Sequence, residues 1–107
     1  MMLKFAVVQH KRPDMTFEQF RDYLLRVHAP LAKRIPGLRK CIYNLVLDDA
    51  TRKAPDWHGI IELYFDDFPS MQAAWATPEG RAATNDNPQY ADLKRTSWSI
   101  VEEITIL

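Results

Sequence analysis

The stretch of sequence that decides the fold is HGIIELYF, residues 58–65. Its β-branched and aromatic residues predict a β-strand. Successive side chains of a strand point to opposite faces of a sheet. One face of this strand therefore carries Ile61, Leu63 and Phe65, and the other carries Ile60 and Tyr64. Because both sets are apolar, both faces of the sheet need cover.

Three further segments are predicted strands, namely residues 3–8, 38–47 and 97–106. Each has apolar residues at both alternating sets of positions, as residues 58–65 have. The polar segment 48–56 separates the second strand from the third, and it is predicted to be a long hairpin loop.

The first helical region follows the first strand. Thr16 is a good N-cap, and Gln19 three residues later completes a capping box. Helical spacing places five residues on one face: Phe17, Phe20, Leu24, Val27 and His28. Pro30 disfavours helical geometry at Ala29, so the regular helix is predicted to end there. A further turn through residues 31–33 is possible before the stop at Pro36-Gly37.

The second helical region follows the third strand, with Pro69 at its start. Met71, Ala74 and Trp75 share one side of this helix. Thr77 before Pro78, and Asn87 before Pro88, are further N-cap signals. We therefore expect the region to be broken into shorter helices.

The order of elements is β-α-β-β-α-β, which predicts a single α+β domain of ferredoxin-like architecture over residues 1–107, with a four-stranded antiparallel sheet. Right-handed crossovers place both helical regions on one face of this sheet. The other face is apolar and uncovered. A second copy, sheet against sheet, is its simplest cover, so we expect a homodimer.

Composition narrows the class of protein. Fourteen basic residues balance fourteen acidic ones, which argues against nucleic acid as a partner. No apolar run approaches the roughly 20 residues that span a membrane, and no secretion signal is evident, so a cytoplasmic protein is expected. Cys41 is the single cysteine, which excludes an internal disulfide and a thiolate metal cluster.

Two groups of short motifs resemble the EthD family. The first is Arg26-Val27-His28-Ala29-Pro30 followed by Pro36-Gly37-Leu38-Arg39, and the second is residues 59–66 followed by Ala76-Thr77-Pro78-Glu79-Gly80. The resemblance runs from the first strand to the last and implies a dimeric α+β barrel. Members of this family take part in ether degradation, in rearrangement of methylated muconolactones, and in dehydration or decarboxylation of polyketides. Where the methylisomerase branch has a tyrosine two residues beyond the position of Arg39, this chain has Cys41.

His28 is the first catalytic candidate. It lies on the inward face of the first helix near its C-terminal end, where the helix dipole favours the imidazolium and burial opposes it. Such a balance leaves a pKa near neutrality, which suits acid–base catalysis. The alternative is a core histidine bonded to a backbone carbonyl.

The third strand supplies further candidates, because His58, Glu62 and Tyr64 alternate and are expected to share one face. Glu62 is a candidate catalytic group that transfers a proton or orients a histidine. Its alternative is a salt bridge across the dimer or to Arg39. His58 and Tyr64 are candidates for substrate binding, although His58 sits at a strand end where exposure is expected.

The second strand carries Tyr43, which can donate a hydrogen bond to a substrate carbonyl or enolate and is the third catalytic candidate. Asn44 on the opposite face is a candidate polar anchor for substrate. Cys41 shares the face of Tyr43 and is expected to be a small buried hydrophobe within the substrate-binding region. Trp75, together with Trp57 and Trp98, is a candidate aromatic wall for a flat ligand, with core packing as the alternative.

No cofactor is expected. The three histidines lack metal-binding spacing, and three glycines form no phosphate-binding loop. The sequence predicts a cofactor-independent enzyme of the isomerase, dehydratase or decarboxylase type, acting on a carbonyl-bearing aromatic, lactone or polyketide-like compound. Three alternatives remain open. One is a cofactor-free oxidoreductase or accessory protein in ether or aromatic degradation, and another is a non-catalytic binder of a hydrophobic metabolite. The third is a purely structural or partner-binding dimer, which would bind no ligand of pocket size.

Overall fold

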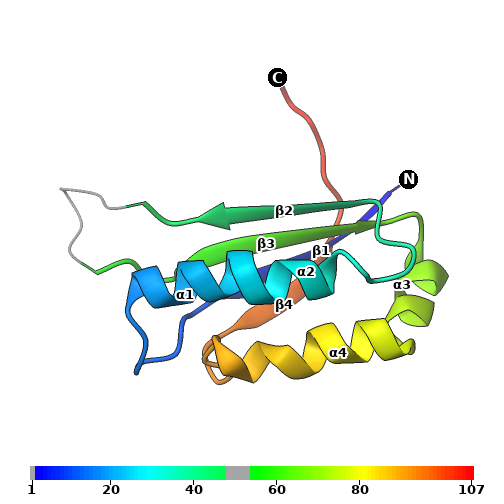
Figure 1. Cartoon of the computed structure of the whole chain (residues 1–107). Helices are drawn as coiled ribbons and strands as arrows, with labels where there is room; N and C mark the ends of the chain where they lie inside the picture. Colours follow the sequence, from blue (N-terminus) through cyan, green and yellow to red (C-terminus); the bar gives the residue numbers. More distant parts are fainter. Residues whose placement is uncertain (1, 48–53) are drawn as a thin grey trace.

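The computed structural model describes residues 2–47 and 54–107, and it has the ferredoxin-like fold (Figure 1). Four strands form one antiparallel sheet in the order β2-β3-β1-β4. The strands are β1 (Leu3–Gln9), β2 (Lys40–Leu45), β3 (Gly59–Phe65) and β4 (Ser97–Val101). The helical segments are α1 (Phe17–Tyr23), η1 (Leu24–His28), α2 (Ala29–Ala32), α3 (Phe68–Trp75), α4 (Pro78–Asp86) and η2 (Asn87–Gln89). The predicted fold class and order of elements are confirmed.

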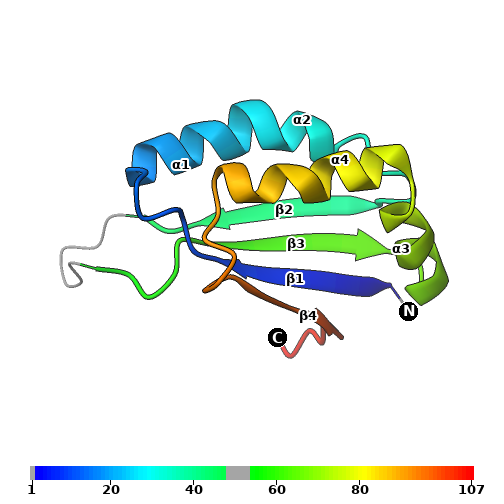
Figure 2. The same cartoon turned by 90° about the horizontal axis from the view of Figure 1, so that it is seen from below.

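The sheet has one covered face and one open face. The run α1–η1–α2 and helix α4 lie side by side over the same face (Figure 2). In the register, Val7, Ile61 and Tyr43 stand in one row across β1, β3 and β2, and they point toward the helices. Ala6, Glu62 and Ile42 form the neighbouring row and point to the open face. The alternation predicted from residues 58–65 is therefore confirmed.

The first helical region begins as predicted. The Thr16 side chain accepts from the backbone N–H of Gln19 at 3.1 Å, and the Gln19 side chain accepts from the N–H of Thr16 at 2.8 Å. These two bonds satisfy donors that a helix N-terminus leaves unpaired. This capping box fixes the start of α1.

The predicted end of this helix at Ala29 is wrong, because the chain stays helical through Ala29 and Pro30 to Ala32. The segment η1 is a π-helical turn, in which the N–H of Ala29 donates to the carbonyl of Leu24, five residues back. Such a widened turn gives the ring of Pro30 room against the preceding turn, and Pro30 has no N–H to satisfy.

The widened turn also changes which side chains are buried. Phe20, Leu24 and His28, each four residues apart, face the sheet and are 0%, 0% and 8% exposed. Val27 was expected on this face, but it is 44% exposed. Residues four apart share one face of an α-helix, and the π-helical turn from Leu24 to His28 keeps this spacing. The turn thus carries His28 to the inner side of the layer.

Helices α3 and α4 are separate, as the repeated N-cap signals predict. Asp67 caps α3 through the N–H of Ser70, and Thr77 caps α4 through the N–H of Gly80. Gly80 lies so close to α3 that a β-carbon there would overlap the carbonyl oxygen of Ala74. The glycine therefore permits the close packing that brings α4 over the sheet.

The strand boundaries differ from the predicted ones mainly at β2 and β4, which cover 40–45 and 97–101 instead of 38–47 and 97–106. Residues 102–107 leave the sheet and extend away from its open side (Figure 1). Of the loop predicted over residues 48–56, residues 48–53 lie outside the described part of the chain. None of the helices in the described part has the length and apolar character needed to cross a membrane.

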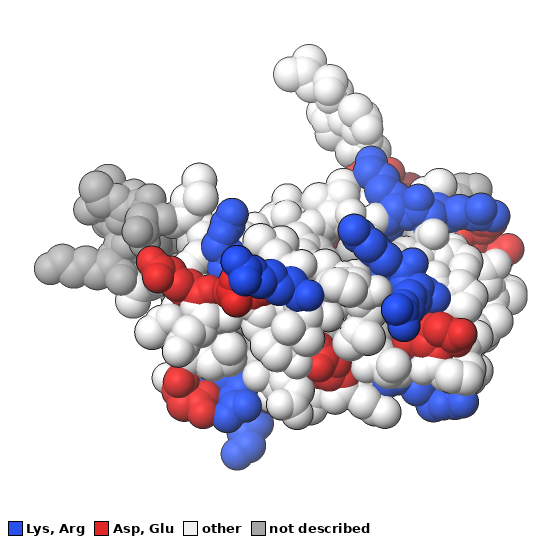
Figure 3. Space-filling model, viewed as in Figure 1, with Lys and Arg blue, Asp and Glu red and all other residues white. Residues whose placement is uncertain are grey.

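Charges of both signs are interspersed over the face that carries α1 and α2 (Figure 3). This arrangement fits the balance of fourteen basic and fourteen acidic residues in the whole chain. The face shown is therefore not a single-sign surface of the kind that binds polyanions.

Candidate functional site

A pocket of about 720 Å³ lies between the covered face of the sheet and the helices. Phe5 and Val7 of β1, together with Ile61 and Leu63 of β3, form its apolar floor. Among the polar groups on its wall are Gln9, His28, Tyr43, Asn87 and Tyr90. A large apolar cavity with a few convergent polar side chains is the usual form of a small-molecule site.

His28 reaches the wall of this pocket from the π-helical turn η1. Its Nδ1 lies 2.9 Å from Oδ2 of Asp86, at the end of α4. A carboxylate only accepts hydrogen bonds, so Nδ1 carries the proton and donates the hydrogen bond to Asp86. The other ring nitrogen, Nε2, then carries a lone pair. The alternative expectation of a bond from His28 to a backbone carbonyl is wrong, since the partner is a carboxylate.

Asp86 is itself held from a second side. The hydroxyl of Tyr23, in the last turn of α1, donates to Oδ1 of Asp86 at 2.6 Å. Burial, and next the hydrogen bond to Asp86, raise the pKa of Tyr23 to about 12, so this hydroxyl keeps its proton at neutral pH. With each carboxylate oxygen engaged by a different donor, Asp86 holds the imidazole in one orientation.

Burial lowers the pKa of His28 below its ordinary value of 6.5, and the Asp86 carboxylate opposes that effect without overcoming it. The imidazole is therefore neutral at pH 7, the state in which Nε2 accepts a proton. The expected contribution of a helix end is small, because α2 continues the helix beyond His28.

Tyr43 projects from β2 into the same pocket. Its hydroxyl oxygen is buried, and no residue in the described part of the chain is bonded to it. Burial raises the pKa of this phenol well above its ordinary value of 10.0, so the hydroxyl remains a neutral donor. An unpaired donor inside an apolar pocket is suited to the oxygen of a bound carbonyl group.

Aromatic rings close the pocket on the side of β1 and α3. The ring of Phe5 lies 5.4 Å from that of Trp75 in an edge-to-face arrangement, and 5.1 Å from that of Trp98 in a stacked one. Trp75 and Trp98 both line the cavity. Trp75 also packs against the core, so its position agrees with both sequence-based interpretations.

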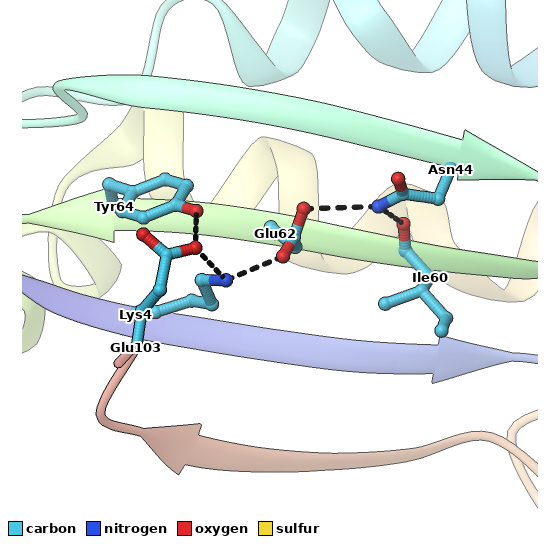
Figure 4. A network of polar contacts seen from close by, with 6 residues as sticks. All are labelled: Lys4, Asn44, Ile60, Glu62, Tyr64 and Glu103. Atoms are coloured by element: carbon cyan, nitrogen blue, oxygen red, sulfur yellow. Dashed lines mark hydrogen bonds and ion pairs between the residues drawn. The ribbon is translucent and has the colours of Figure 1, made fainter. Parts of the chain in front are cut away.

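Three other predicted site residues lie on the opposite, open face of the sheet (Figure 4). The Lys4 ammonium bonds Oε1 of Glu62 and Oε2 of Glu103, each at 2.6 Å. Asn44 donates to Oε2 of Glu62 at 3.0 Å, and the Tyr64 hydroxyl donates to Oε2 of Glu103 at 2.8 Å. Glu62, Asn44 and Tyr64 are thus brought together with one another, but not with His28 or Tyr43.

The ion pairs of this network explain how Glu62 is accommodated between apolar neighbours. The Lys4 ammonium first, and then the Asn44 amide, hold the pKa of Glu62 below its ordinary value of 4.5. The two glutamates in turn raise the pKa of Lys4. The alternative partner suggested for Glu62 was Arg39, and this is wrong because Arg39 pairs with Asp66 at 2.8 Å.

His58 and Cys41 also differ from their expected positions. His58 precedes β3, and its ring lies 6.1 Å from that of the buried Phe20, on the helix side and not on the face of Glu62. Its Nδ1 accepts the backbone N–H of Lys11 at 3.0 Å. Cys41 was expected to be buried, but it lies on the edge strand β2 and is exposed.

Sequence reasoning missed Gln9 and Tyr90, which line the pocket, and Asp86, which bonds His28. A signal existed for Asp86, since it lies three residues after the buried Ala83 and so on the inward side of α4. Across residues 2–47 and 54–107, no cluster of three or more His, Cys, Asp or Glu side chains is placed to hold a metal ion.

A family model, the EthD domain, matches residues 12–94 of the chain. Among solved structures, the chain is similar to an ethyl tert-butyl ether D (EthD) family protein of Bacillus halodurans C-125. The identity is 30%, the TM-score is 0.81, and the match covers 97% of this chain and 100% of that chain. No curated protein matches the chain at a significant level.

Two more distant structures share the fold. One is a dimeric ferredoxin-like protein of unknown function from Bacteroides fragilis NCTC 9343, at 18% identity and a TM-score of 0.68, covering 95% of this chain and 96% of that chain. The other is SnoaB, a cofactor-independent oxygenase from Streptomyces nogalater, at 14% identity and a TM-score of 0.66, covering 99% of this chain and 96% of that chain. Identities this low are evidence of the fold alone.

Proposed function

The chain belongs to the EthD family, and we propose that it is a cofactor-independent enzyme that moves a proton on a small, apolar, carbonyl-bearing compound. The observation that carries this proposal is the His28–Asp86 pair, in which both side chains are nearly closed to solvent and His28 borders an apolar pocket. A neutral imidazole fixed by a carboxylate is a general base at neutral pH. The pocket volume of about 720 Å³ accommodates a ligand of two or three fused rings.

In the proposed reaction, Nε2 of His28 takes a proton from a carbon next to the substrate carbonyl. The electron pair of the broken C–H bond moves to the carbonyl oxygen, which becomes an enolate. The negative charge of the Asp86 carboxylate stabilises the imidazolium that forms. The Tyr43 hydroxyl donates a hydrogen bond to the enolate oxygen and keeps its proton.

The fate of the enolate defines the reaction type. Return of the proton from His28 to a different carbon is an isomerisation. Loss of a β-hydroxyl group, with the proton leaving as part of water, is a dehydration. In a decarboxylation, His28 first takes the proton of the substrate's carboxylic acid, loss of carbon dioxide leaves the same enolate, and His28 then returns that proton to carbon. All three use the same arrangement of His28, Asp86 and Tyr43.

A second candidate is cofactor-free oxygenation, in which molecular oxygen reacts with the substrate carbanion. The likeness in fold to SnoaB, described as a cofactor-independent oxygenase, favours including it. The same base would generate the carbanion, but oxygenation consumes molecular oxygen whereas the proton-transfer reactions do not. An oxygen electrode during turnover separates the two candidates.

We also propose that a second copy covers the open face of the sheet. Beside the polar Lys4, Asn44 and Glu62, that face carries apolar side chains from every strand, among them Ile42, Ile60 and Val101. Exposed apolar patches rimmed by polar residues mark interaction surfaces. A structural relative is described as dimeric, which supports this. A native mass of one chain, at concentrations where the protein is active, would rule out the dimer.

Proton exchange tests the proposed function without knowledge of the natural substrate. The probe is 2-tetralone, a flat aromatic ketone with an acidic benzylic C–H beside its carbonyl. In D₂O, protein-catalysed enolate formation replaces this hydrogen by deuterium, which proton NMR follows. We expect exchange above the buffer rate that saturates with the probe. Saturable binding without faster exchange would instead identify a binder.

A further inference from the structure

Gln9, at the end of β1, lines the pocket and is 4% exposed. Its Nε2 donates to the Tyr90 hydroxyl at 3.1 Å, and that hydroxyl donates to Oδ1 of Asn87 at 2.8 Å. A phenol hydroxyl can donate only one hydrogen bond, and here Asn87 accepts it. Tyr90 is therefore an acceptor toward Gln9, which fixes which end of the Gln9 amide faces it.

The other end of this amide has no partner. Oε1 of Gln9 is buried, and among the described residues none donates a hydrogen bond to it. A buried acceptor is normally paired, so an unpaired one on a pocket wall calls for an explanation. A molecule in the pocket can reach Oε1 after a small turn of the terminal amide, because that torsion is soft.

We propose that Gln9 determines specificity by selecting a ligand with a hydroxyl group, whose proton Oε1 accepts. This inference rests on the proposed function, in which Tyr43 binds a carbonyl oxygen of the same ligand. The two residues have opposite requirements. Gln9 needs a donor on the ligand, whereas Tyr43 needs an acceptor.

The sheet register sets the spacing of these two groups. Gln9 pairs with Gly59, and Tyr43 pairs with Ile61, so strand β3 lies between the strands that carry them. Neighbouring strands are about 4.8 Å apart, and Gly59 and Ile61 lie about 7 Å apart along β3, so the positions of Gln9 and Tyr43 are roughly 12 Å apart. A hydroxyl and a carbonyl at opposite ends of two fused rings span a comparable distance. The substrate class is therefore a hydroxylated, fused-ring aromatic ketone.

Three fluorescent probes test the requirement for a hydroxyl donor. They are 6-acetyl-2-naphthol, its methyl ether, and 2-acetylnaphthalene, which keeps the carbonyl but lacks the hydroxyl group. We expect the wild-type protein to bind the naphthol about tenfold more tightly than either analogue, the size of one well-placed hydrogen bond. Equal affinities, tighter binding of the ether, or no saturable binding of any probe would overturn the inference.

Variants at two glutamines assign the preference to Gln9. Gln9→Met, which removes the acceptor at nearly constant volume, is expected to reduce the tenfold preference to less than about twofold. Gln72→Met is the matched control, because Gln72 also lines the pocket but from α3. It is expected to retain the preference. Loss of the preference in both variants alike would contradict a specific role for Gln9.

A conservative variant guards against a purely structural effect. Gln9→Glu keeps an oxygen acceptor at the same place, and we expect it to retain the preference for the naphthol. If it lost the preference while folding normally, as judged by circular dichroism, the acceptor role would be wrong. These affinities do not depend on proton transfer. If the protein preferred the naphthol but did not accelerate 2-tetralone exchange, the enzyme proposal would be wrong while the inference about Gln9 would hold.

Discussion

Oδ2 of Asp86 lies 2.9 Å from Nδ1 of His28, across a separation of 58 residues in the sequence. The bond joins η1, which precedes the β2–β3 hairpin, to the end of α4, over the covered face of the sheet. Both side chains are nearly closed to solvent, at 10% and 13% exposed. A hydrogen bond between ionisable groups in such a site is strong, and it orients the imidazole toward one task.

Asp86→Asn tests the importance of this carboxylate. Asparagine can still accept the Nδ1 proton, but it cannot stabilise an imidazolium by charge. We expect the rate of 2-tetralone exchange to fall about 10- to 100-fold, with the naphthol affinity little changed. Tyr23→Phe, which removes the hydroxyl on Oδ1, is expected to give a smaller fall. A wild-type rate in Asp86→Asn would show that Asp86 has no part in proton transfer.

The pH dependence of exchange follows from the state of His28. Only the neutral imidazole acts as a base, and burial lowers the pKa of His28 below 6.5. We therefore expect the rate to rise with pH, to level off by about pH 7, and to stay flat above it. Since Asp86 raises the pKa of His28, Asp86→Asn is expected to move the rising limb to lower pH. A limb that moves to higher pH would contradict this electrostatic assignment.

The network on the open face makes a prediction about stability. Lys4 is 8% exposed and bonds two glutamates, so Lys4→Met leaves Glu62 and Glu103 without their shared cation. We expect the free energy of unfolding, from urea titration, to fall by about 2 kcal/mol. Arg39→Met is the matched control, because the pair of Arg39 with Asp66 is exposed, and its loss is expected to be smaller. Equal losses would argue against the network.

Gly80 is predicted to be essential for the packing of α4 on α3. A methyl group at this position would overlap the backbone carbonyl of Ala74, which cannot move without shifting the helix. Gly80→Ala is expected to lower the free energy of unfolding by roughly 2–3 kcal/mol. Gly59→Ala is the comparison, since its methyl group would meet the end of the Leu45 side chain at 3.3 Å. The opposite order of the two effects would contradict the described packing.

Much of the fold could be predicted because its signals are local. The alternation in residues 58–65 and the capping box at Thr16 each involve neighbours in sequence, and both are confirmed. The π-helical turn was missed because Pro30 was taken as a helix end. That interpretation considers only the local clash, and the structure relieves the clash by widening one turn.

The site could be predicted only in part, because its partners come from different layers. Strand parity correctly separates Tyr43 from Asn44, but parity does not say which face the helices cover. Glu62 was therefore a candidate to transfer a proton or to orient a histidine, although it lies on the face opposite to His28, with Lys4. The pairing of His28 with Asp86 depends on how α4 docks, which no local pattern encodes.

The proposed reaction depends most on His28 as the base, and one pair of variants tests this directly. His28→Asn can keep the bond to Asp86 through its amide but removes Nε2. His58→Asn is the matched change at a histidine outside the described lining of the pocket, and its oxygen can still accept the N–H of Lys11. The measurement is 2-tetralone exchange in D₂O near neutral pD. We predict that His28→Asn lowers the rate by roughly 100-fold or more while His58→Asn stays close to wild type. A folded His28→Asn protein that exchanges the probe at the wild-type rate would contradict the account.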